Sequence, residues 1–127
     1  MARKQTPTLT EAELRLMDVI WDRGEATVHE VLAALPPENS PAYNTVLTIM
    51  RILEQKGYLS HEKHGRAHRY RPLVGRMEAR QKAVRHMVSN FFNGSPQQLM
   101  LNMIESRDLG EEDLKDLKRL IEESERG

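Results

Sequence analysis

The sequence predicts a mainly α-helical protein with one small β-hairpin, three helices before the hairpin and three after it. Three observations predict this fold class. Apolar residues recur at spacings of three and four, the period of one helix face. Thr10 and Thr27 each stand three residues before a glutamate, as in a capping box. Two short alternating segments flank a turn at residues 64–66, which is typical of a hairpin.

End signals define the first two helices. The first begins at a Thr10 cap and ends at Gly24, and the second begins at a Thr27 cap and ends before Pro36. Proline ends a helix because it cannot donate the next backbone hydrogen bond. The expected packed faces of these helices are Leu14, Met17, Ile20 and Trp21, and Val28, Val31, Leu32 and Leu35.

A third helix is predicted over residues 41–56 and the hairpin over residues 58–71. Ser40 is the expected cap and Pro41 the first helical residue. Gly57 suits the left-handed turn that follows a helix. Three helices followed by a basic hairpin is the element order of a winged helix-turn-helix domain.

Beyond residue 75 the pattern is helical. Helices are predicted over residues 76–92, after a Ser95 cap, and over residues 110–125. Three short amphipathic helices have little core to bury alone, so we expect a C-terminal dimerisation region. The alternative is that these helices fold back on the first domain. The expected dimer-interface residues are Val84, Val88, Phe91, Leu99, Met103, Leu114, Leu117 and Ile121.

We therefore predict three parts: a disordered arm at residues 1–8, a winged-helix domain at 9–75 and a helical dimerisation domain at 76–127. The net charge of zero hides an asymmetry between them. Residues 51–85 contain ten Lys or Arg against three acids, and residues 105–127 contain nine acids against five bases. A basic middle suggests a polyanion partner, although two ordinary solvated surfaces would have the same composition.

One face of the third helix has side chains suited to reading DNA bases. On a helical wheel, Thr48, Arg51 and Gln55 fall within about 40° of Asn44, and Thr45 lies about 100° from it. Asn, Thr and Arg are side-chain types that hydrogen-bond to base edges. The opposite side is apolar through Val46, Ile49, Met50 and Leu53. The alternative is that this is the ordinary polar face of an amphipathic helix.

The hairpin is basic around its turn. Lys63, Arg66 and Arg69 could rest on the DNA backbone, adding salt-dependent affinity without sequence information. Three histidines of the hairpin, His61, His64 and His68, raise the alternative of a metal site. Their spacing on two strands does not put all three on one face, so we expect no metal.

Several function classes are disfavoured by what the sequence lacks. No apolar run reaches the roughly 18 to 20 residues that span a bilayer, and no secretory signal begins the sequence. There are no cysteines, which excludes disulfides and thiolate metal sites and fits a cytoplasmic protein. No spacing matches a catalytic motif, so we expect neither an enzyme nor a cofactor.

The sequence resembles the BlaI/MecI/CopY family of transcriptional repressors, the penicillinase-repressor family, over about residues 9–124. The resemblance is carried by Trp21-x-x-Gly24, by Tyr43-Asn44-Thr45-Val46-x-Thr48, by Leu53-x-x-Lys56-Gly57, by Gly65-Arg66-Ala67, and by NFFNGSPQQLMLNMIES in the tail. It implies a homodimer that blocks transcription from a double-stranded operator with dyad symmetry. The family's third helix enters the major groove, which implies that Asn44, Thr45, Thr48 and Arg51 contact the bases. The hairpin is the wing of this fold, and the resemblance implies that its Lys63, Arg66 and Arg69 contact the DNA backbone.

The resemblance also bears on how such a repressor is released. In members that control β-lactam resistance, a membrane sensor protease triggers cleavage of an Asn-Phe bond in the dimerisation region. The matching bond here is Asn102-Met103, where methionine replaces phenylalanine. Copper-responsive members use a C-terminal cysteine cluster, which this sequence lacks. Two alternatives remain open: a winged helix that binds a protein partner, and a repressor released by a small effector instead of cleavage.

Overall fold

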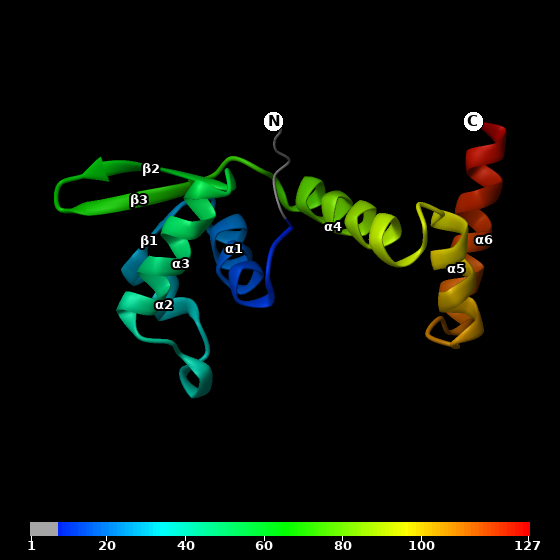
Figure 1. The fold of residues 1–127 in the computed structure, drawn as a ribbon, viewed down its shortest axis with the longest axis horizontal. Coiled ribbons are helices and arrows are strands. Elements are labelled where there is room, and N and C mark those ends of the chain that lie inside the picture. The colour runs from blue at the N-terminus through cyan, green and yellow to red at the C-terminus, as the bar shows by residue number, and fades with distance from the viewer. Residues whose placement is uncertain (1–7) are drawn as a thin grey trace. The chain divides into compact units, whose positions relative to one another are not determined.

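A computed structural model describes residues 8–127, so most of the predicted N-terminal arm lies outside the described residues. The described chain forms six α-helices, one short 3-10 helix and three strands (Figure 1). It divides into two compact units between Val84 and Arg85. The first unit holds all the strands and the helices α1 to α3, and the dividing point lies inside α4, Arg76–Phe91.

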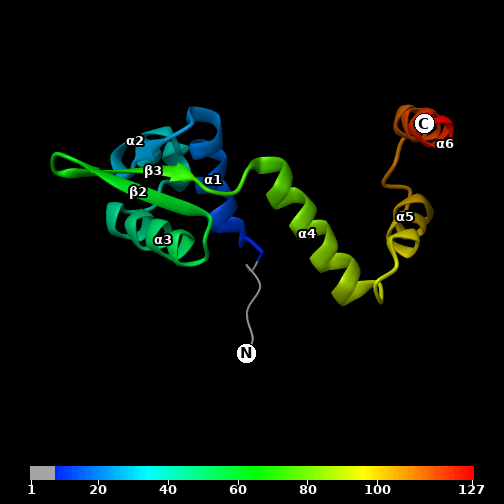
Figure 2. The same cartoon turned by 90° about the horizontal axis from the view of Figure 1, so that it is seen from above.

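The first unit has the predicted element order. Helices α1 (Glu11–Arg23), α2 (Val28–Ala34) and α3 (Tyr43–Gln55) precede a hairpin of β2 (Leu59–His64) and β3 (Ala67–Pro72). The hairpin extends past the helices in both views (Figures 1 and 2). A two-residue strand that the sequence analysis missed, β1 (Ala26–Thr27), pairs antiparallel with β3 and gives the sheet order β1-β3-β2.

Both predicted capping boxes are confirmed. The backbone N–H of Glu13 donates to Thr10 Oγ1, and the Glu13 carboxylate accepts from the Thr10 N–H. Thr27 and Glu30 repeat this arrangement at the start of α2. Each box satisfies backbone donors that a helix start would otherwise leave unpaired.

The predicted start of the third helix is wrong. Its N-cap is Ala42, which makes no side-chain capping bond, and the helix begins at Tyr43 rather than at Pro41. Ser40 instead ends a 3-10 helix over Pro37–Asn39, where its N–H donates to the Pro37 carbonyl. The local signal was ambiguous, because an extended residue before a proline fits an N-cap and a loop equally well, and Ser40 is extended in a loop here.

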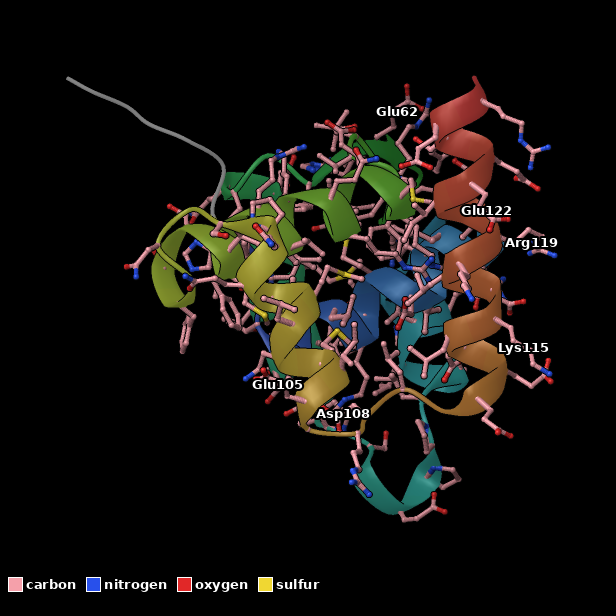
Figure 3. The ribbon with its side chains drawn as sticks, turned by 90° about the vertical axis from the view of Figure 1, so that its right-hand side faces the viewer. Glu62, Glu105, Asp108, Lys115, Arg119 and Glu122 are labelled. Carbon is pink, nitrogen blue, oxygen red and sulfur yellow. The ribbon has the colours of Figure 1, made fainter. Side chains whose placement is uncertain are left out.

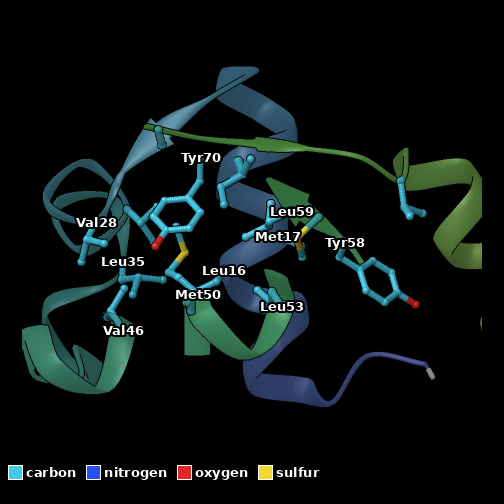
Figure 4. Packing of buried hydrophobic residues seen from close by; sticks show 14 of the residues in the cluster. Leu16, Met17, Val28, Leu35, Val46, Met50, Leu53, Tyr58, Leu59 and Tyr70 are labelled. Atoms are coloured by element: carbon cyan, nitrogen blue, oxygen red, sulfur yellow. The ribbon is translucent and has the colours of Figure 1, made fainter. Parts of the chain in front are cut away.

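The core of the first unit lies between the three helices and the sheet (Figure 4). The expected face of α1 is partly wrong, because Leu14 is 43% exposed and Trp21 is only half-buried. The buried face is turned toward Glu13 and Leu16, which join Met17 and Ile20. Apolar periodicity could not find this face, since one of its members is a carboxylate.

The start of α4 packs on the first unit. The indole N–H of Trp21 donates to the Val74 carbonyl over 2.9 Å. The Arg76 guanidinium lies 2.9 Å from Asp22 and over the Trp21 ring. Ala79 belongs to the core cluster. The first turns of α4 are therefore anchored to α1.

The second unit continues with α5 (Pro96–Glu105) and α6 (Glu111–Arg126), close to the predicted bounds. Ser95 caps α5 as expected, accepting from the Gln98 N–H. Neither α5 nor α6 contains a buried residue. Charged side chains, labelled Lys115, Arg119 and Glu122, follow one side of α6 (Figure 3). Within residues 8–127, no helix has both the length and the apolar character needed to cross a bilayer.

Candidate nucleic-acid interface

The predicted base-reading residues share the exposed side of α3. All four are exposed: Asn44, Thr45, Thr48 and Arg51. On the other side of the helix, Val46, Met50 and Leu53 are each 0% exposed. The buried side fixes the rotation of α3, so the polar side is held outward by the core.

Thr48 has a restricted hydrogen-bonding role. Its Oγ1 hydroxyl donates to the Asn44 backbone carbonyl over 2.9 Å. The hydroxyl proton is therefore engaged within the helix. The oxygen lone pairs and the methyl group remain exposed, and these can accept from a base amino group or contact a thymine methyl.

The end of α3 is fixed by a largely buried ion pair. Lys56 Nζ lies 2.6 Å from Glu13 Oε1, and the two side chains are 20% and 8% exposed. Burial would raise the pKa of the Glu13 carboxyl, but hydrogen bonds from Lys56 and from the Thr10 backbone outweigh it. The pKa of Glu13 is held below its ordinary value of 4.5. Gly57 follows with a φ of 89°, which confirms the predicted left-handed turn.

The hairpin is also attached to α3. The His61 Nδ1 lies 2.9 and 2.8 Å from the two carboxylate oxygens of Glu54. The His61 ring stacks on His68 at 4.4 Å. The strand register pairs Lys63 with His68 and His64 with Ala67, so His64 lies on the other face of the sheet from His61. The face holding His61 and His68 therefore joins the hairpin to α3.

The hairpin turn is two residues long. Gly65, with a φ of 64°, and Arg66 connect β2 to β3. A positive φ in such a turn favours glycine, because it carries no β-carbon. Lys63 and Arg66 are exposed near this turn, and neither makes an ion pair with any residue from 8 to 127. Their charges are available to an external anion.

The other basic residues of the hairpin are neutralised. Arg69 is half-buried and lies 3.4 Å from Glu30, the capping glutamate of α2. The Thr27 backbone N–H, followed by the charges of Arg69 and Arg23, lowers the pKa of Glu30. Arg71 lies 2.8 Å from Glu62. Arg69, expected on the DNA backbone, thus already has a partner within the protein.

A hollow of about 350 Å³ lies between α3 and the hairpin, and we call it the α3–wing hollow. The hairpin turn and β3 line it through Arg66, Ala67 and His68, and α3 through Tyr43, Leu47 and Arg51. Thr27, Val28 and His29 complete the lining, and the His29 and Tyr43 rings lie 4.7 Å apart. Sequence reasoning missed His29 and Tyr43, because strand pairing and helix packing bring them to the hairpin.

The expected interface residues of the helical region differ in exposure. Four are exposed, with Phe91 reaching 78%: Val84, Phe91, Leu114 and Ile121. Leu99, Met103 and Leu117 are half-buried, and Val88 is already buried within the chain. At the predicted cleavage site, Asn102 is exposed and lies inside α5 beside Met103.

Three helices with an outward-facing polar third helix, and a basic hairpin on a three-stranded sheet, define the winged helix-turn-helix class. The sequence profile of the family "Penicillinase repressor" matches residues 9–123. The chain belongs to the penicillinase repressor family, which confirms the resemblance seen in the sequence.

Curated relatives match along nearly the whole chain. The "Penicillinase repressor" of Bacillus licheniformis is 29% identical over 120 residues, covering 94% of each protein. The "Transcriptional regulator BlaI" of Mycobacterium tuberculosis (strain CDC 1551 / Oshkosh) is 32% identical over 121 residues, covering 94% of this chain and 86% of the relative. These relatives are transcriptional regulators rather than enzymes.

Solved structures match the winged-helix part. The DNA-binding domain of the repressor BlaI has a TM-score of 0.53 at 32% identity, covering 60% of this chain and 93% of that chain. Monomeric Bacillus licheniformis BlaI in complex with the blaP half-operator has a TM-score of 0.50 at the same identity and coverage. These matches confirm the predicted fold.

Proposed function

We propose that this protein is a dimeric, sequence-specific repressor that binds operator DNA through α3 and the hairpin. The observation that carries this proposal is the exposed side of α3, where Asn44, Thr45, Thr48 and Arg51 stand without a carboxylate among them. The residues behind this side are fully buried, so the face is rigid. The solved complex of a family member with half-operator DNA supports the same use of the fold.

In this proposal α3 lies in the major groove and the hairpin rests on the backbone. Asn44 and Thr48 meet base edges, and Lys63 and Arg66 meet phosphates. Arg69 makes a smaller contribution, since Glu30 already pairs with it. Base contacts supply sequence specificity, whereas phosphate contacts supply salt-dependent affinity for any DNA.

Footprinting on the region upstream of its own gene identifies the operator, and gel shifts over a salt series then test the reading face. Asn44→Ala and Thr48→Ala should each cost about 1–3 kcal/mol on the operator and little on random DNA. Thr48→Val serves as a matched variant, because it keeps the methyl group and removes the acceptor. Lys63→Ala should weaken binding to the operator and to random DNA by the same factor. If Asn44→Ala and Thr48→Ala lower affinity for operator and random DNA equally, these residues do not read bases. A wild-type chain that binds neither DNA would favour the alternative of a protein partner.

Dimerisation through α4, α5 and α6 is part of the proposal. Its support is the apolar surface that these helices leave exposed, which a second copy would cover: Val84, Met87, Phe91, Met100, Leu101, Ile104, Leu114, Leu120 and Ile121. One dimer then binds two half-sites, and the second contact gains from the high effective concentration set by the first.

Release by cleavage at Asn102-Met103, triggered by a membrane sensor protease, follows from the family resemblance. The bond lies inside α5, so α5 must open locally before a protease can cut it. Cutting there would separate α4 from α6 and weaken the dimer. A chain with an uncleavable bond should stay on DNA in induced cells. If that chain is released as readily as the wild type, a small effector is the better explanation.

A further inference from the structure

Arg51 and Arg66 approach one hollow from two different elements. Arg51 lies on the third turn of α3 and Arg66 in the hairpin turn, and both line the α3–wing hollow. No aspartate or glutamate lines this hollow. In the described part of the chain, neither guanidinium has a carboxylate partner, whereas Arg69 and Arg71 both do.

Two unpaired guanidinium groups on one hollow make a site for an anion. Their mutual repulsion is relieved when an anion enters, and a guanidinium offers paired donors that match the oxygens of a phosphate. The remaining polar groups of the lining suit the same ligand. Tyr43 and Thr27 bear hydroxyls, and His29 and His68 bear ring nitrogens, all of which can hydrogen-bond to phosphate oxygens.

The proposed docking puts a DNA strand in this position. With α3 in the major groove and the hairpin on the backbone, the strand that borders the groove passes between these two elements. We propose that Arg51 and Arg66 together hold one phosphate of that strand in the α3–wing hollow. Arg51 is then a backbone contact, and base reading falls to Asn44, Thr45 and Thr48. This inference rests on the proposed function and narrows the role of one residue in it.

The test is a double-mutant cycle of Arg51→Ala and Arg66→Ala, measured on operator and on random DNA over a salt series. Each single variant should weaken binding to operator and to random DNA by the same factor, about tenfold per subunit. The double variant should lose less than the product of the two factors, because both arginines serve one phosphate. It should also lower the slope of log K against log salt by about 0.9 per subunit, the value for one phosphate, and so by about 1.8 for the dimer.

Arg71→Ala is the matched control, because the Arg71 guanidinium is paired with Glu62 at 2.8 Å, and it should change neither affinity nor slope. Far-ultraviolet circular dichroism checks that every variant is folded. If Arg51→Ala lowers affinity for the operator but not for random DNA, Arg51 contacts a base. That result would overturn this inference and leave the proposed function standing. So would a double variant with fully multiplied losses and a slope lowered by about 1.8 per subunit, which means two separate phosphates for each subunit. A wild-type chain that binds neither DNA would overturn the proposed function as well.

Discussion

The ion pair between Lys56 and Glu13 should control the stability of the DNA-binding unit, and Lys56→Met tests it. The substitution leaves the Glu13 carboxylate, with a side chain only 8% exposed, without its cation. Glu13 keeps the hydrogen bond from the Thr10 N–H, which shares the same carboxylate oxygen with Lys56. Removing one partner of a buried ion pair destabilises the folded state, because the other charge is left buried without a partner.

The structure bounds the size of the effect. Losing a charge-assisted hydrogen bond costs at least about 1.5 kcal/mol. The upper estimate is the free energy of protonating Glu13 instead, because a neutral carboxyl no longer needs the cation. From the ordinary pKa of 4.5, protonation at pH 7 costs about 3.4 kcal/mol at 1.36 kcal/mol per pH unit. Lys56→Met should therefore lower the free energy of unfolding by about 1.5–3.4 kcal/mol at pH 7.

The pH dependence should have a definite sign. In the wild type the pKa of Glu13 is lowered, so its stabilisation is present above pH 4.5 and is lost as pH falls through the lowered value. In Lys56→Met, burial without a cation raises the pKa of Glu13. The variant then gains stability relative to the wild type as pH falls from 7 toward 4.5.

The assay is urea unfolding followed by fluorescence of Trp21, the one tryptophan of the chain, which lies in the DNA-binding unit. Glu13→Gln with Lys56→Met should be more stable than Lys56→Met alone, because no buried charge remains. Lys63→Met, on an exposed lysine without an ion pair in the described chain, should stay within about 0.5 kcal/mol of the wild type. A Lys56→Met loss that is the same at pH 7 and pH 5, or a double variant no better than the single one, would refute the reasoning.

Two further predictions concern the dimer and the hairpin. Leu117→Asp should turn the proposed dimer into a monomer, because it places a charge on the apolar side of α6, whereas Lys118→Asp at the exposed neighbouring position should not. Light scattering measures the mass, and equal masses for the two variants would contradict this prediction. Gly65→Ala should lower the free energy of unfolding by about 1–2 kcal/mol, because φ is 64° at this position. Gly75→Ala should lower it less, because Gly75 has no positive φ and an added β-carbon would meet open space there. If both substitutions lower the free energy of unfolding equally, the positive φ of the hairpin turn is not what requires glycine at position 65.

The features that the sequence predicted correctly depend on neighbours within a few residues. The capping boxes at Thr10 and Thr27 involve groups three positions apart, and the exposed side of α3 follows from helical periodicity around Val46 and Met50. Such features form wherever the local pattern is strong, so reading them requires no knowledge of the tertiary fold.

The features that the sequence did not reveal depend on distant partners. Glu13 is buried in α1 because Lys56 reaches it from 43 positions away, and no apolar pattern marks such a residue. Arg69 reads as an ordinary basic wing residue until Glu30 is found beside it, 39 positions earlier. The strand β1 has only two residues, which is too short for an alternation to be seen.

The distribution of ion pairs explains how a chain of zero net charge can present a basic face. Four of the ten basic residues between Arg51 and Arg85 are paired with acids, and these pairs lie away from the exposed side of α3: Lys56 with Glu13, Arg69 with Glu30, Arg71 with Glu62, and Arg76 with Asp18 and Asp22. Six of the ten have no ion pair in the described chain: Arg51, Lys63 and Arg66 stand around α3 and the hairpin turn, whereas Arg80, Lys82 and Arg85 lie on α4. Charge counted along the sequence therefore overstates the electrostatic part of DNA binding, and the salt dependence per subunit should follow Arg51, Lys63 and Arg66 rather than all ten.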